Sequence, residues 1–145
     1  MIVKDVLFTF TKLPQIKIEG NTVSRFRIEK LLRRTGAKTI IICDDEYIIP
    51  HKSVIVDFGK LDYVKNRRWI ANRFDCDNFA GSMYGTACEV LPLVAFGIVH
   101  VSRTREKDRH ALNFCVLSDD SIWYFEPQQA QLFQDKTYIP EFFYV

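Results

Sequence analysis

The chain has 145 residues, of which 48% are hydrophobic and 14% aromatic, and its net charge is +2. This length and hydrophobic content predict one globular domain over residues 1–145 and exclude a disordered chain. The mild charge gives no reason to expect nucleic acid as a partner. No run of about 18 apolar residues is present to span a membrane, so we expect no membrane partner.

The four cysteines include no C-x-x-C pair of the kind that holds zinc. Lys4 and Asp5 interrupt the N-terminal segment, which therefore lacks the apolar run of a signal peptide. These two observations predict a cytoplasmic protein with reduced thiols.

The first half of the chain alternates strand-like and helix-like patterns. We predict short strands within residues 1–18, a helix over 21–34 that ends near Gly36, a hairpin of strands 39–43 and 46–50, and a strand over 53–58. The hairpin prediction rests on two β-branched runs that flank Asp44 and Asp45.

The second half begins with a predicted helix over residues 76–90, because its apolar residues recur on one face. Strands are predicted at 94–101, 110–117, 121–126 and 138–145. A helix that bears a cysteine and packs against an antiparallel sheet is an α+β fold.

Cys76 stands at the predicted start of that helix, directly after Asp75. Aspartate is a favoured N-cap residue, and the partial positive charge of a helix N-terminus favours thiolate over thiol. A thiolate is a nucleophile, so Cys76 is a candidate catalytic residue. A buried structural cysteine is the alternative interpretation.

His110 and Glu126 are predicted to lie at the same end of one hairpin. A turn over residues 118–121 pairs residue 110 with about residue 129, close to Glu126. A histidine oriented by an acid, together with a cysteine, forms the catalytic set of thiol hydrolases. His100 is the alternative base. Asn72 is a candidate oxyanion donor or, alternatively, a turn residue.

Three sequence elements carry a resemblance to a known family. They are Phe74-Asp75-Cys76-Asp77-Asn78-Phe79-Ala80, His110-Ala111-Leu112-Asn113 and Tyr124-Phe125-Glu126-Pro127-Gln128. Over residues 70–130 the chain resembles the papain-like cysteine protease domain of the Marasmius oreades agglutinin, whose relatives also occur in bacteria and phages. Residues 1–60 stay unassigned.

The resemblance implies a papain-like fold with Cys76 as nucleophile, His110 as general base and Glu126 as the orienting acid. It also implies activation by calcium, for which Asp75, Asp77 and Gln128 are the candidate ligands. The sugar-binding trefoil of the agglutinin has no counterpart in the chain, so no sugar-binding domain is expected.

These inferences predict a cysteine peptidase or related thiol hydrolase that acts on a protein or peptide through a thioester intermediate. One alternative is a catalytically silent interaction protein on the same scaffold, of the kind that phages encode. Another is a transglutaminase or deamidase, because these enzymes share the first acylation step.

Overall fold

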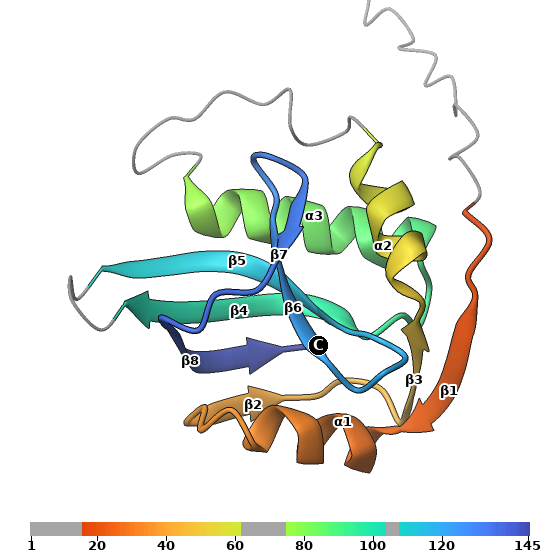
Figure 1. Cartoon of the computed structure of the whole chain (residues 1–145), viewed down its shortest axis with the longest axis horizontal. Helices are drawn as coiled ribbons and strands as arrows, with labels where there is room; N and C mark the ends of the chain where they lie inside the picture. Colours follow the sequence, from red (N-terminus) through yellow and green to blue (C-terminus); the bar gives the residue numbers. More distant parts are fainter. Residues whose placement is uncertain (1–15, 62–74, 104–107) are drawn as a thin grey trace, which may run out of the picture.

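The computed structural model describes residues 16–61, 75–103 and 108–145 (Figure 1). The helices are α1 (Arg25–Arg33), α2 (Lys52–Gly59) and α3 (Cys76–Val90). The strands are β1 (Gly20–Ser24), β2 (Thr39–Ile41), β3 (Glu46–Pro50), β4 (Phe96–Arg103), β5 (Arg109–Val116), β6 (Ile122–Glu126), β7 (Gln131–Phe133) and β8 (Tyr138–Tyr144).

Most strands join one six-stranded sheet in the order β2-β8-β4-β5-β6-β7, while β1 and β3 form a separate pair. The pairs of the large sheet are antiparallel except β2 with β8, which is parallel. Because β8 lies between β2 and β4, the last strand of the chain connects the N-terminal half to the central hairpins.

The β5–β6 hairpin forms as the sequence predicts. Leu117 N donates to Ser121 O, and Asp120 takes a left-handed conformation with φ of 64°. A three-residue loop with a left-handed last residue is a common hairpin connection. The register pairs Asn113 with Phe125, one residue away from the predicted alignment.

Three predictions in the first half are wrong. The two β-branched runs do not pair with each other, because β2 joins β8 and β3 joins β1. Residues 53–58 lie in helix α2 instead of a strand. The predicted helix over 21–34 starts only at Arg25, and the residues before it form β1. The predicted strands up to residue 15 lie outside the described residues.

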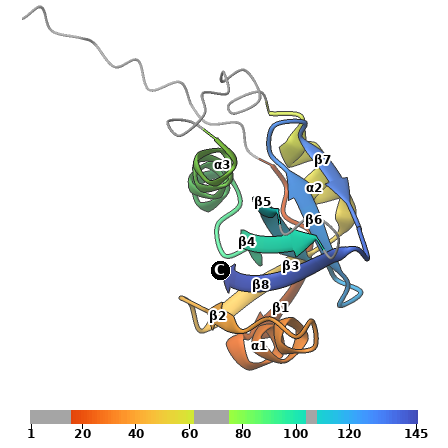
Figure 2. The same cartoon turned by 90° about the vertical axis from the view of Figure 1, so that its left-hand side faces the viewer.

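Two hydrophobic cores lie on the two faces of the large sheet, and Figure 2 shows α1 and α3 on different sides of its strands. On one face, Ile28, Leu31 and Leu32 of α1 pack with Leu112 and Phe114 of β5. On the other face, apolar residues of α2 and α3 pack with Phe96 of β4, Cys115 of β5 and Phe125 of β6. Burying each helix along one apolar side accounts for this three-layer arrangement.

Asn113 links α3 to the sheet, and Gly97 allows two strands of the sheet to approach closely. Asn113 Nδ2 donates to Ala80 O of α3 at 2.9 Å and to Gly97 O of β4 at 3.0 Å. A Cβ atom at Gly97 would lie 2.1 Å from Tyr144 O, so only glycine allows β4 and β8 to approach in this way.

The predicted papain-like α+β fold needs correction. Strands hold more of the described residues than helices do, and helices cover both faces of a mixed sheet. The helix that begins at Cys76 does form, over Cys76–Val90, as the apolar spacing predicts. The error arose because the sequence pattern of the first half did not reveal α2 or the parallel β2–β8 edge.

Candidate binding site beside the central hairpin

His110 and Glu126 meet at one end of the β5–β6 hairpin. His110 Nε2 lies 2.8 Å from Glu126 Oε2, and the other carboxylate oxygen accepts a hydrogen bond from Gln128 N at 3.3 Å. The two side chains are 29% and 15% exposed. Because both carboxylate oxygens have partners, Glu126 holds the imidazole in one orientation. The predicted meeting of these two residues is confirmed.

The pair lines a pocket with a volume of about 540 Å³. Most of its lining side chains are charged or carry amides, and two are aromatic. The lining residues are Arg103, Asp108, Arg109, His110, Glu126, Gln129, Gln131, Phe133, Asp135 and Tyr138. The strand pairing explains this gathering, because β5, β6 and β7 are neighbours in the sheet and β8 reaches the same end through β4.

Arg103 and Tyr138 line the pocket from the β4–β8 pair. Arg103 donates to Tyr138 Oη at 3.0 Å, and its guanidinium lies 5.1 Å from the centre of that ring. Phe133 packs edge-on against Tyr138 with ring centres 6.0 Å apart. Hydrogen bonds from Thr137 lower the pKa of Asp135, and the nearby Arg103 charge acts in the same direction.

This lining can recognise a polar ligand. Guanidinium and amide groups are planar donors with fixed directions, and the arginine fork matches a carboxylate. The rings add apolar contact area next to those donors. Sequence reasoning found only His110 and Glu126 here. It missed Arg103 and Tyr138, because the pairing of β4 with β8 joins residues that are far apart in the sequence.

Cys76 lies at the N-terminus of α3 and is half-buried. Asp75 is the N-cap as predicted, and its N–H donates to Asn78 Oδ1 at 3.2 Å in a capping box. A hydrogen bond with Asp75 lowers the pKa of Asp77, and the nearby His100 acts in the same direction. The neighbourhood of Cys76 therefore contains carboxylates and His100.

The alternation of side chains along β5 places His110 on the face opposite to the one that packs on α3. Asn113 points to α3, whereas Leu112 and Phe114 point to the opposite core. Successive side chains of a strand alternate between faces, so His110 shares the face of Leu112. Among the described residues no hydrogen bond joins Cys76 to His110. The catalytic roles of Cys76, His110 and Glu126 stay predictions.

Asp75, Cys76 and Asp77 form a cluster whose ligand atoms lie within 4.8 Å of one another. Calcium takes roughly six to eight oxygen ligands, and the two carboxylates of this cluster would supply some of them. Calcium binding by Asp75, Asp77 and Gln128 stays a prediction that a calorimetric titration measures. Asn72, the predicted oxyanion donor, lies outside the described residues.

Comparison with known proteins gives structural similarity alone. No family model and no curated protein matches the sequence. A solved structure described as a PSL1a–E64 complex has a TM-score of 0.72 and 18% identity, over 84% of this chain and 50% of that one. The lectin of Polyporus squamosus, bound to the epitope Neu5Acα2-6Galβ1-4GlcNAc, has a TM-score of 0.69 and 18% identity, over 84% and 49%.

The chain has the fold of these matched structures. It spans about half the length of each solved chain. The similarity to a lectin corrects the predicted identity and function, which were those of a papain-like cysteine peptidase or thiol hydrolase. The alternatives of a silent papain-like scaffold and a transglutaminase or deamidase are corrected with it. The expectation of no sugar-binding domain is also corrected, because the matched lectin was solved with a glycan.

Among the described residues, no helix is both long and apolar enough to cross a lipid bilayer.

Proposed function

We propose that this chain binds a carbohydrate in the pocket beside the His110–Glu126 pair. The observation that carries the proposal is the lining itself, which combines cations, amides and aromatic rings in about 540 Å³. Sugars present many hydroxyl groups that need directed donors and acceptors, and their C–H faces pack on aromatic rings. The structural similarity to a lectin that was solved with a glycan supports the same function.

The two arginines of the pocket offer places where the carboxylate of an acidic sugar can bind. Arg103 and Arg109 both line it, and the carboxylate of Glu126 is already engaged by His110 and by Gln128 N. An arginine fork binds a carboxylate through two parallel hydrogen bonds. Asp108 and Asp135 also line the pocket, and they disfavour a second negative charge on the ligand.

Isothermal titration with Neu5Acα2-6Galβ1-4GlcNAc, and with Galβ1-4GlcNAc as the uncharged counterpart, tests the proposal. We expect the sialylated glycan to bind and Gln129→Ala to raise its Kd by about fivefold to tenfold, because one hydrogen bond is lost. Gln129 is exposed and lines the pocket, so its replacement should leave the fold intact.

Gln128→Ala is the matched control, because Gln128 is the sequence neighbour of Gln129 but does not line the pocket. Its Kd should equal that of the unaltered chain. If neither glycan binds, or if the two variants weaken binding equally, this pocket is not a carbohydrate site.

We also propose a cytoplasmic location. The support is that the four cysteines are free thiols in the structure, as is usual in reducing compartments. Cell fractionation followed by immunodetection tests this location, and recovery in a secreted fraction would contradict it.

A further inference from the structure

Helix α1 and its C-cap Arg34 form a strongly basic surface on the outside of the molecule. This α1 surface contains Arg25, Arg27, Lys30, Arg33 and Arg34, against one acid, Glu29. The apolar side of the helix is buried in the core through Ile28, Leu31 and Leu32. The basic side chains lie outside this apolar core.

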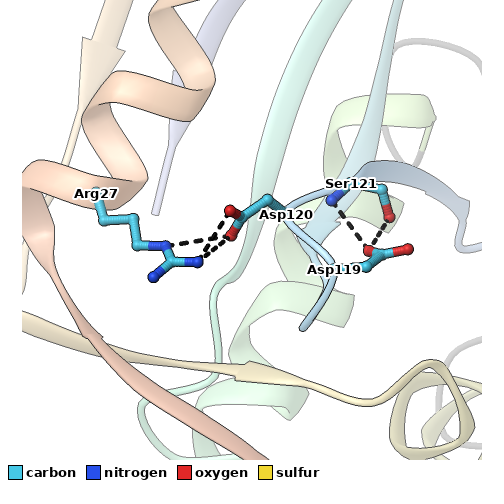
Figure 3. Close-up of polar contacts among 4 residues, drawn as sticks. All are labelled: Arg27, Asp119, Asp120 and Ser121. Atoms are coloured by element: carbon cyan, nitrogen blue, oxygen red, sulfur yellow. Dashed lines mark hydrogen bonds and ion pairs between the residues drawn. The ribbon is translucent and has the colours of Figure 1, made fainter.

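Three of these cations already have partners. Arg25 lies 3.7 Å from Asp45, and Arg33 lies 2.6 Å from Glu29. Arg27 forms a forked pair with Asp120 of the β5–β6 turn, with contacts of 2.9 Å from one nitrogen to both carboxylate oxygens (Figure 3). Among the described residues, no ion pair is formed by Lys30 or Arg34.

Lys30 and Arg34 are one helical turn apart and line a hollow of about 400 Å³. Phe26, one turn earlier, lines the same hollow, and its side chain is 75% exposed. Such exposure is unusual for a large aromatic residue, since phenylalanine is generally buried. The hollow thus places two unpaired cations beside an exposed ring.

We propose that this hollow binds an acidic peptide segment of a partner protein, with a carboxylate between Lys30 and Arg34 and an apolar side chain on Phe26. Charge complementarity selects an anionic partner. The concave shape favours a projecting peptide over a flat bilayer, and the apolar face that a membrane-bound helix needs is buried here. Two unpaired cations also give few phosphate contacts for nucleic acid.

Fluorescence anisotropy with a labelled peptide of alternating glutamate and leucine tests the proposal, with glutamine in place of glutamate in the control peptide. We expect Lys30→Glu with Arg34→Glu to weaken binding at least tenfold. The matched control is Lys17→Glu with Lys60→Glu, which changes the net charge equally at exposed lysines elsewhere and should leave the Kd within about twofold.

For Asp120→Asn we expect a gain of affinity, which a partly unfolded variant would not show. Asparagine tolerates the left-handed backbone of this position, where φ is 64°. The substitution releases Arg27 and removes a negative charge from the lining of the hollow. We therefore expect tighter binding of the glutamate peptide, by about threefold or more.

The proposal is overturned if the glutamine peptide binds equally well, or if the control double variant weakens binding as much as the test variant. It is also overturned if phosphatidylserine vesicles or duplex DNA bind with this dependence on Lys30 and Arg34 while the glutamate peptide does not bind. This surface and its test are independent of the proposed sugar pocket.

Discussion

At the residue scale, Asn113 shows how one polar side chain fixes the position of a helix. It is fully buried, and its Nδ2 links α3 to β4. Its Oδ1 accepts no hydrogen bond from the described residues. The amide therefore acts here through its Nδ2 donor group, which two carbonyl oxygens share.

We expect Asn113→Ala to lower the free energy of unfolding by about 1–3 kcal/mol, because two buried carbonyls lose a donor. Asn113→Asp should cost more, because it buries a carboxylate that has no donor to offer. Urea unfolding measures both effects. Asn21→Ala on the exposed strand β1 is the control, and a loss at Asn113 no larger than at Asn21 would contradict this account.

At the element scale, the β5–β6 turn depends on Asp119 and Asp120. Asp119 accepts hydrogen bonds from Ser121 N at 3.0 Å and from the Ser121 hydroxyl (Figure 3). These hydrogen bonds lower the pKa of Asp119. A carboxyl with a lowered pKa in the folded state adds stability above its unfolded pKa, and this stability is lost as the pH falls through the folded pKa.

Asp119→Ala should therefore lower the Tm by about 1–3 °C at neutral pH, a small effect because the group is exposed to solvent. The difference between the variant and the unaltered chain should shrink in acid, below the usual aspartate pKa. Thermal unfolding followed by circular dichroism at several pH values measures this trend. A difference that is constant with pH would show that the carboxylate charge has no role.

The loop of this hairpin explains why the predicted register of β5 and β6 is wrong by one residue. The loop spans three residues because Asp120 adopts the left-handed conformation. Loop length sets the register, and a shift by one residue moves every side chain to the other face of the sheet. The sequence therefore predicted that His110 and Glu126 meet, but not which face they occupy.

At the scale of the whole molecule, β8 joins the two halves of the chain. Phe143 of β8 is fully buried and packs against Phe114 of β5, with ring centres 4.7 Å apart. The strand lies between β2 and β4. Loss of packing here should therefore weaken both the N-terminal half and the central hairpins.

We expect Phe143→Ala to cost about 3–5 kcal/mol in unfolding free energy, because it leaves a cavity in the core. Tryptophan fluorescence and circular dichroism should report one shared transition in urea. Phe26→Ala, at an exposed ring, should leave the midpoint unchanged. Separate transitions for the two probes would show that β8 does not couple the halves.

Local patterns in the sequence determined the features that depend on neighbouring residues. The apolar spacing and Asp75 predicted the helix that begins at Cys76, and turn residues predicted the hairpin that brings His110 to Glu126. Helix caps and turns are local interactions, so the sequence specifies them directly.

Only the tertiary structure decided the rest. Residues 53–58 have the β-branched composition of a strand, yet burial of Val54, Ile55 and Phe58 in the core with α3 makes them a helix. The pocket depends on Arg103 and Tyr138, which only the β4–β8 pairing brings together. His110 and the helix α3 that begins at Cys76 lie on opposite faces of β5, and long-range strand pairing sets those faces.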